Sequence, residues 1–376
     1  MFSKQKLTRR QFICSATTMV TLPLISHVAA SDISEHFEES LAKVWRPITA
    51  PITDQTLLKR ELVRYATLAA SSHNTQCWKF KIQQNSIVVL PDFTRRCPAV
   101  DPDNHHLFVS LGAATENLLQ AALYNGLHGE IHINGEAMQS INIALLPTKP
   151  IESPLFKAIP HRQCTRAEYD SKPLSAEELK LLALAGTGNG VQVLLHTKKQ
   201  AMENILEYVV AGNSAQMHDP AFMAELKSWI RFNSQDAVRT GDGLYSAASG
   251  NPSLPKWLGG TLFDLFFNAR SENDQYAKQL RSSAGVAIFV SNANDRAHWL
   301  EVGRCYERFA LQATALGIRS AFLNQAVKVP EVRQQFANYL NVDEKIGTSR
   351  IDLVVRFGRG GNMPQSLRRL IDAVLI

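Results

Sequence analysis

The chain has 376 residues, of which 45% are hydrophobic and 20% charged, so it can bury a large core in one or two domains. This composition excludes a mainly disordered chain, and five cysteines with 20 glycines exclude a disulfide scaffold and a collagen-like repeat. The formal charge is +6, but the first 30 residues hold four basic residues and no acid. The rest of the chain has 36 basic and 34 acidic residues, and this near balance argues against nucleic acid as a partner.

The N-terminus has the pattern of an export signal. Arg9-Arg10 precede an uncharged run from Ile13 to Ile25, and Val28-Ala29-Ala30 follow. This order resembles a twin-arginine (Tat) signal peptide. A helix over the uncharged run is about 20 Å long, too short for a hydrocarbon core of about 30 Å, so we expect no stable membrane anchor. We expect residues 1–30 to be cleaved after Ala30 and the protein to reach the periplasm through the Tat translocase; the alternative is the basic start of a cytosolic protein.

The first part of the mature chain predicts alternating helices and strands. Apolar periodicity and turn residues place helices at Ser34–Val44, Leu57–Ala70 and Leu107 to about Gly126, a hairpin of strands Trp78–Ile82 and Ser86–Leu90, and a strand at Ile141–Leu146. Residues 47–51 are expected to be a linker, and a proline-containing loop follows the hairpin.

The second part repeats the alternation. Predicted helices are Ser175–Ala185, Met202–Val210 and Trp299–Leu316; predicted strands are Val191–His196, Gly285–Val290, Arg319–Phe322 and Ser349–Gly358. Ser175 with Glu178 predicts a capping box at the first of these helices. The order helix, strand, helix, strand therefore occurs twice.

A shift of 191 residues brings the two parts into register. It superimposes identical residues at Gly112 and Gly303, Glu116 and Glu307, Ala122 and Ala313, and Gly126 and Gly317. The common spacing from a glycine at the helix start to one at its end favours internal duplication over two unrelated amphipathic helices. We expect a first half at 31–150 and a second half at 151–376.

The four cysteines after residue 30 and the pair His105-His106 lack the spacing of a metal-binding motif. Cys77, Cys97, Cys164 and Cys305 lack a CxxC pair, so we expect isolated thiols. His105-His106 has no third ligand nearby in the sequence, so solvated loop histidines are expected rather than a metal site.

Two polar segments remain as candidates for chemistry. Ala70–Trp78 offers small hydroxyls and amides before an aromatic residue, and His161–Arg166 offers two arginines. Neither segment has a counterpart in the other half, so a single site built from both halves is the simplest interpretation. The glycine-rich Gly186–Gly190 follows a helix rather than a strand and lacks the third spaced glycine of a dinucleotide fingerprint, so we expect a loop there.

Four features together resemble the nitroreductase superfamily, above all its Acg-like branch, in which one long chain resembles a fused dimer. They are the segment Ser71–Gln76 with Trp78, the segment Arg162–Arg166, the helix Trp299–Leu316, and Arg356–Gly358 followed by Arg368-Arg369. The resemblance covers about residues 57–376. It implies an α+β nitroreductase-like fold with two similar halves forming a pseudo-dimer, antiparallel-containing sheets flanked by helices, and one FMN at the interface. Ala70 and Cys77 depart from prolines, and Gln163 from a frequent second arginine.

The resemblance also assigns cofactor-binding residues, and their chemistry suits FMN. A phosphate needs charged, forked donors, and the candidates are Arg162, Arg368 and Arg369. Serine and asparagine side chains match the donors and acceptors of the flavin pyrimidine edge, and the candidates are Ser71, Ser72 and Asn74. By family analogy, Arg166 lies near flavin N1 and O2, Cys164 stands where a hydroxyl residue is common, and Asn324 and Gln325 lie near N5.

A long insert at 217–283 contains a glycine- and serine-rich run and several aromatic residues. Such an insert is either a lid or a helical element packed on the core, and the two are compatible.

The expected function is that of an exported FMN-binding oxidoreductase that reduces nitroaromatic or quinone-type acceptors through flavin N5, without an obligatory protein acid or base. The alternatives are an FMN-sequestering or storage protein with little turnover and a non-flavin relic of the fold. A small-molecule acceptor is the expected partner, NAD(P)H is one candidate donor, and a monomer acting as a pseudo-dimer is expected.

Overall fold

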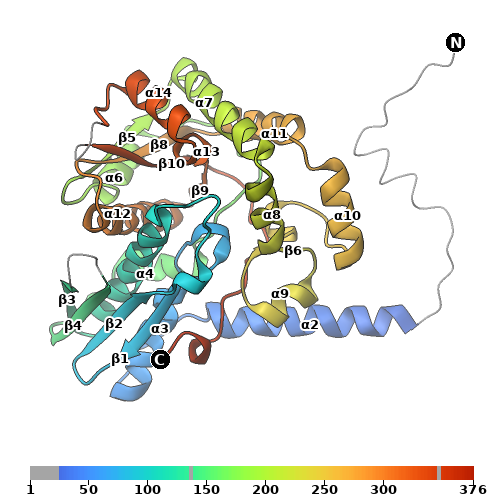
Figure 1. Ribbon diagram of the computed structural model, residues 1–376. Coiled ribbons are helices and arrows are strands. Elements are labelled where there is room, and N and C mark those ends of the chain that lie inside the picture. The colour runs from blue at the N-terminus through green and yellow to red at the C-terminus, as the bar shows by residue number, and fades with distance from the viewer. Residues whose placement is uncertain (1–24, 135–138, 345–348) are drawn as a thin grey trace, which may run out of the picture.

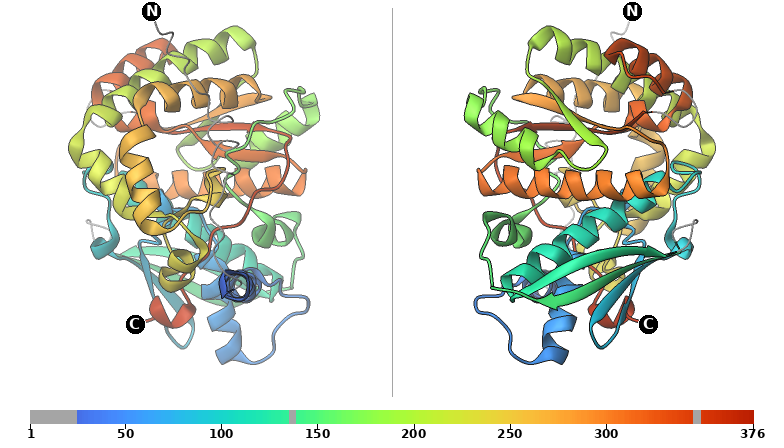
Figure 2. Two further views of the ribbon diagram at one scale, coloured as in Figure 1. Left: turned by 90° about the vertical axis from the view of Figure 1, so that its right-hand side faces the viewer. Right: turned by 90° about the vertical axis from the view of Figure 1, so that its left-hand side faces the viewer.

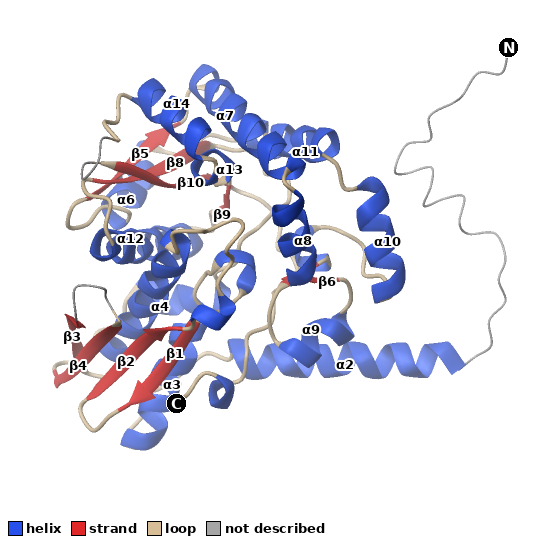
Figure 3. Ribbon diagram, in the orientation of Figure 1, coloured by secondary structure: helices blue, strands red, loops and turns tan. Residues whose placement is uncertain are grey.

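The computed structural model describes residues 25–134, 139–344 and 349–376. Two four-stranded antiparallel sheets, one in each half of the chain, are covered by helices (Figure 1, Figure 3). The expected α+β class, with two halves and antiparallel sheets flanked by helices, is confirmed.

The first half follows the predicted order with one added strand. Its elements are α3 (Gln55–Thr67), β1 (Trp78–Ile82), β2 (Ser86–Pro91), α4 (His105–Tyr124), β3 (Leu127–Asn134) and β4 (Ser140–Pro147), with short helices η1 (Ser72–Asn74) and η2 (Phe93–Arg95). The strand order is β1-β2-β4-β3. Strand β3 was not predicted, because Gly129 and Glu130 interrupt its apolar alternation; it lies at the edge of the sheet, where such residues are tolerated.

The second half has the sheet order β5-β8-β10-β9. Its elements are α5 (Pro154–Ala158), η3 (Ile159–His161), α6 (Ala176–Ala185), β5 (Val191–His196), α7 (Lys199–His218), β8 (Gly285–Ser291), α12 (Arg296–Ala315), β9 (Arg319–Phe322), α13 (Gln325–Lys328), α14 (Pro330–Leu340) and β10 (Arg350–Gly358). The predicted capping box of Ser175 and Glu178 is present at α6. Every residue of β8 and β10 is buried, because helices cover the sheet on both faces.

The two halves meet where α4 crosses α12, between the two sheets (Figure 2). The crossing is at Gly112 and Gly303. A Cβ on Gly112 would lie 1.9 Å from the Leu300 carbonyl oxygen, and a Cβ on Gly303 would lie 1.9 Å from that of Val109. Because 109 and 300 differ by the same 191 residues as 112 and 303, the contact is reciprocal, as across a two-fold axis. The aligned glycines therefore form the interface between the halves, and duplication itself stays a prediction.

The C-terminal segment returns from the second half to the first. The Phe80 N–H donates to the Val374 carbonyl at 2.8 Å, and the Ile376 N–H donates to the Phe80 carbonyl at 3.0 Å. The chain end thus covers the free edge of β1 (Figure 1). Arg368 and Arg369 lie in this segment outside any helix, and η5 (Ile371–Ala373) follows them. The expected boundary at 150 remains a prediction, but the final residues pack on the first half.

The insert is mainly helical. It contains α8 (Pro220–Trp229), α9 (Ser234–Thr240), η4 (Ala247–Ser249), α10 (Lys256–Phe266) and α11 (Ala269–Arg281), with β6 (Ile230–Arg231) pairing in parallel with β7 (Leu244–Tyr245). Helix α9 packs on α2 (Ile25–Trp45). Residues 1–24, which carry the predicted twin-arginine motif, lie outside the described part, and α2 runs through the expected cleavage point after Ala30. Among the described helices, none combines the length and apolar character needed to cross a membrane.

Candidate functional site

The serine-containing loop between α3 and β1 has an unusual backbone. His73, Asn74 and Gln76 have φ values of 48°, 53° and 54°, in the left-handed region that residues other than glycine rarely adopt. Each such residue costs of order 1–3 kcal/mol and persists only where its surroundings impose it. The sequence Ser71–Gln76 is therefore held in a defined shape, as is common at binding sites.

Contacts from the insert and the C-terminal segment impose this shape. Asn74 Nδ2 donates to the carbonyls of Gly243 and Leu367, both at 3.1 Å, and the Gly243 N–H donates to the Asn74 carbonyl at 3.1 Å. Gln76 Nε2 donates to the Gly241 carbonyl at 2.8 Å. Gly243 has a φ of 78°, and a Cβ there would lie 2.4 Å from the Trp229 carbonyl oxygen, so this close approach requires glycine.

The polar groups of the loop are used unequally. Ser71 Oγ accepts the Gln76 N–H at 3.0 Å, and Gln76 Oε1 accepts the Arg369 N–H at 2.8 Å. Asn74 Oδ1, in contrast, is buried without a hydrogen-bond partner among the described residues. A buried acceptor without a donor is costly, so this oxygen is suited to a ligand N–H.

Arg166 lies on the opposite side of the junction, in the second half. Its Nη1 is 3.3 Å from Ser249 Oγ of the insert, and the structure gives it no carboxylate partner among the described residues. Burial first, and then the charges of Lys328 and Arg166, lower the pKa of His73 to about 4, which places Arg166 within electrostatic reach of the first-half loop. A half-buried guanidinium without an acid partner is available to an anionic or carbonyl-rich ligand.

Arg356, on β10, fixes the backbone around Arg166. It is fully buried, and its Nη2 donates to the carbonyls of Thr165 at 3.0 Å and Ala167 at 2.7 Å. Its guanidinium carbon lies 4.0 Å from the centre of the Tyr169 ring. Burial lowers its pKa. A charged residue inside the apolar run of β10 was the sequence signal for this positioning role, which the prediction left unassigned.

Arg162 and Arg368 are brought together at the C-terminal end of α3. Arg162 Nη2 donates to the Leu68 carbonyl at 2.9 Å, and its Nε lies 2.9 Å from Glu307 Oε1. Arg368 Nε donates to the Thr67 carbonyl at 2.9 Å, and burial, followed by the charge of Arg162, lowers its pKa to about 9. Both guanidiniums thus satisfy carbonyls that the helix leaves free. Their predicted role in binding phosphate stays a prediction.

The other predicted residues lie in the second half, in the C-terminal segment and, for Ser72, in the first-half loop. Cys164 is half-buried beside Ser320 of β9, and Asn324 Oδ1 accepts the Val354 N–H at 2.9 Å. Gln325 faces Tyr276 of α11, whose pKa is raised to about 12 by burial and then by Glu272. The guanidinium of Arg369 donates to the Ala373 carbonyl at 2.6 Å, and Ser72 is half-buried in the loop of the first half.

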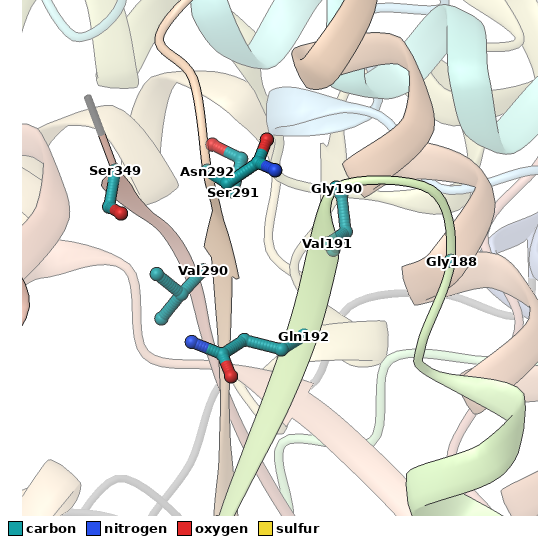
Figure 4. A pocket seen from close by; sticks show the side chains of 8 residues that line it. All are labelled: Gly188, Gly190, Val191, Gln192, Val290, Ser291, Asn292 and Ser349. Carbon is teal, nitrogen blue, oxygen red and sulfur yellow. The ribbon is translucent and has the colours of Figure 1, made fainter. Parts of the chain in front are cut away.

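Two cavities of the described structure include none of the predicted site residues. A cavity of about 840 Å³ between α2, α5 and the C-terminal segment is lined by Lys157, His161, Gln163 and Arg319, with Phe37 and Met363 among its apolar groups. A smaller hollow of about 350 Å³ lies at the ends of β5 and β8 and has no charged lining residue (Figure 4). It includes Gly188 and Gly190 of the glycine-rich segment, which forms a loop as expected.

The expectation for His105 and His106 was wrong. Both side chains are buried at the start of α4, because they hydrogen-bond across the junction to β10. His105 Nε2 lies 2.8 Å from Asp352 Oδ1, and His106 Nε2 lies 3.2 Å from the Asp352 carbonyl. Burial raises the pKa of Asp352 to about 7 and lowers that of His105. These polar residues therefore join the halves. The four described cysteines are free, as expected.

This chain is similar to known proteins in sequence and to solved structures. No protein-family model matches the chain. The chain is 24% identical over 284 residues to a provisionally named NAD(P)H nitroreductase of Mycobacterium tuberculosis, and this alignment covers 73% of this chain and 78% of that protein. The same values hold for its counterpart in a second strain of that species.

Solved nitroreductase structures align with a little over half of the chain. An FMN-bound nitroreductase from Bacteroides fragilis gives a TM-score of 0.35 at 16% identity and covers 58% of this chain and 96% of that one. An FMN-dependent nitroreductase from Mycobacterium smegmatis, in complex with NADPH, gives 0.36 at 14% identity and covers 57% and 94%. The fold is described here from the strand order and helix packing of this chain itself. In sequence, the chain is similar to NAD(P)H nitroreductases over 73% of its length.

Proposed function

We propose that this chain is an FMN-dependent oxidoreductase of the nitroreductase kind. The observation that carries the proposal is the strained loop Ser71–Gln76 of the first half, which the insert and the C-terminal segment hold opposite Arg166 of the second half. The similarity to curated NAD(P)H nitroreductases supports the same conclusion.

The residues present fit FMN. Within the described residues, Asn74 Oδ1 is a buried acceptor without a donor, which suits a ring N–H, and Arg166 is a forked cation without an acid partner, which suits the carbonyl side of the ring. Bound FMN would supply electron transfer at its N5 atom. The chain's own contribution is positional: Arg356 fixes the backbone on both sides of Arg166, and Asn74 is fixed through its Nδ2.

The same proposal assigns the remaining predicted residues. Arg162, Arg368 and Arg369 are our candidates for the phosphate, because Arg162 and Arg368 share one carboxylate, Glu307, and leave an excess positive charge beside Ser71. Ser71, Ser72 and Cys164 would line the cofactor, and Asn324 and Gln325 would lie near N5.

The finer parts of the function are also proposals. The acceptor would be a nitroarene or a quinone, and NAD(P)H is the candidate donor, as the names of the similar proteins suggest. Arg9-Arg10 and the apolar run after them support export by the Tat pathway to the periplasm as a folded monomer that acts as a pseudo-dimer. Nicotinamide pools are cytoplasmic, so steady turnover after export would require another donor.

Anaerobic reduction of the purified chain, loaded with FMN, tests the proposal. We expect NADPH or dithionite to bleach the flavin absorbance and a nitroarene to restore it over several cycles. If FMN binds but neither a nitroarene nor a quinone reoxidises it, the protein stores FMN rather than turning over. If the chain binds no FMN at all, the proposed function is refuted.

A further inference from the structure

Three side chains that the proposed function does not use converge where the insert meets the first half. They are His73 in η1, Cys97 in the loop after η2, and Glu225 on α8. His73 Nδ1 lies 3.7 Å from Cys97 Sγ, and one ligand atom from each of the three residues lies within 4.8 Å of the others. Elements distant in sequence thus present one nitrogen, one sulfur and one carboxylate oxygen to a common point.

The spacing matches a tetrahedral metal centre. Zinc–sulfur and zinc–nitrogen bonds of about 2.3 and 2.0 Å at tetrahedral angles place the two ligand atoms about 3.5 Å apart. The observed 3.7 Å between Nδ1 and Sγ agrees with that value. Nitrogen, thiolate and carboxylate ligands are the set that zinc and cobalt accept, whereas magnesium and calcium prefer oxygen alone.

The Glu225 carboxylate is fixed by backbone groups that follow Cys97 in the chain. Glu225 Oε2 accepts the Ala99 N–H at 2.9 Å, and Oε1 accepts the Val100 N–H at 3.1 Å. Each carboxylate oxygen has a second lone pair, so both hydrogen bonds can remain when a metal binds, and they fix the ligand as outer contacts do in known metal sites. Cys97 is buried in an apolar cluster with Val100 and Phe222, which excludes water from the thiol.

Charges of both signs surround the three groups. The carboxylates of Glu225 and Asp101 act on Cys97, and the cations Lys328 and Arg166 act on His73. The neighbouring group of Asp101, His105 and His106 differs, because the Lys328 ammonium lies 2.7 Å from Asp101 Oδ1 and already supplies a cation there. The described part of the chain thus has two such groups, and the one that contains Cys97 has no ammonium in contact with it.

The geometry points to a zinc-type metal site formed by His73, Cys97 and Glu225. Three protein ligands leave the fourth position to water or another small ligand. The metal fastens α8 of the insert to the loop Ser71–Gln76. This site is independent of flavin chemistry, so its presence or absence leaves the proposed function standing.

Cobalt(II) added to the full, metal-stripped chain tests the site, because cobalt bound by a thiolate absorbs through a sulfur-to-metal charge-transfer band. We expect one cobalt per chain with this band, and zinc should displace it. Cys97→Ser should abolish the band and raise the zinc dissociation constant at least about tenfold, while Cys305→Ser, which alters a buried thiol in α12, should leave both unchanged.

Glu225→Gln provides a second test that keeps the thiol. Its zinc dissociation constant should also rise at least about tenfold, with the circular dichroism spectrum unchanged. If the wild-type chain shows no thiolate band, or if Cys97→Ser and Glu225→Gln bind zinc as the wild type does, the site is refuted. A band that disappears in Cys305→Ser and persists in Cys97→Ser would refute it equally.

Discussion

Replacing Gly112 by alanine should separate the two halves. The new Cβ would lie 1.9 Å from the Leu300 carbonyl oxygen and 3.0 Å from the Gly303 Cα. To reach even 3.0 Å from that oxygen, α4 and α12 must move apart by about 1.1 Å. The obstacle is the backbone of α12, so no side-chain rotation relieves it.

The expected effect is a large loss of stability. Overpacking a core costs about 1–3 kcal/mol, and occasionally more where the neighbour cannot yield. Alanine is favoured over glycine inside a helix by roughly 1 kcal/mol, which offsets part of the loss. We therefore expect Gly112→Ala to lower the free energy of unfolding by about 2 kcal/mol or more. Gly303→Ala should behave alike, because its Cβ would lie 1.9 Å from the Val109 carbonyl oxygen.

Urea unfolding followed by circular dichroism measures the effect, with Gly260→Ala as the matched control. Gly260 is also inside a helix, but a Cβ there meets only Lys227 Cε at 3.8 Å, so the control should be unchanged or slightly more stable. The double variant Gly112→Ala with Gly303→Ala should lose less than the sum of the single losses, because both act on one crossing. A Gly112→Ala chain as stable as the Gly260→Ala chain would refute the reciprocal contact.

Three further predictions concern buried charge and export. Arg162→Ala should lower stability without FMN by about 3 kcal/mol, because it removes the guanidinium that lies 2.9 Å from the buried Glu307 carboxylate, whereas Arg162→Met with Glu307→Leu should recover most of the loss; urea unfolding decides, and equal losses would contradict the pairing. Burial raises the folded-state pKa of Asp352 from 3.8 to about 7, so Asp352 contributes stability that is present below pH 3.8 and lost as the pH rises through 7. The unfolding free energy of the wild type relative to Asp352→Asn should thus fall between pH 4 and 7 and then level off, and a pH-independent difference would contradict this. Arg9→Lys with Arg10→Lys should retain the precursor in the cytoplasm, as fractionation and immunoblotting would show; continued export and trimming would exclude the Tat assignment.

Local pattern was sufficient to predict most elements. The strands Val191–His196 and Arg319–Phe322 have the predicted bounds, because clear apolar patterns define them. Helix α7 extends well past the predicted Val210, to His218, because half-buried polar residues continue it. Periodicity also found the helix pair α4 and α12, but the direct contact of Gly112 with Gly303 depends on how the halves pack.

The candidate site was predictable in its residues and not in its contacts. The loop Ser71–Gln76 could be found from its polar composition, yet its left-handed residues depend on contacts from Gly243 and Leu367, far away in the sequence. For the same reason, no local pattern indicated that Arg368 satisfies the end of α3. The burial of His105 was missed because its partner, Asp352, is on the last strand.

Equilibrium titration of the purified chain with FMN, followed by flavin fluorescence, tests the central claim that both halves form one cofactor site. We expect one FMN per chain. Ser71→Ala, in the first half, should weaken binding by about 1 kcal/mol, and Arg166→Ala, in the second half, by about 1.5–3 kcal/mol, or roughly ten- to 150-fold. Arg239→Ala, which alters a mostly exposed arginine of α9, should bind as the wild type does. Two FMN per chain, or unchanged affinity in either the Ser71 or the Arg166 variant, would contradict the account.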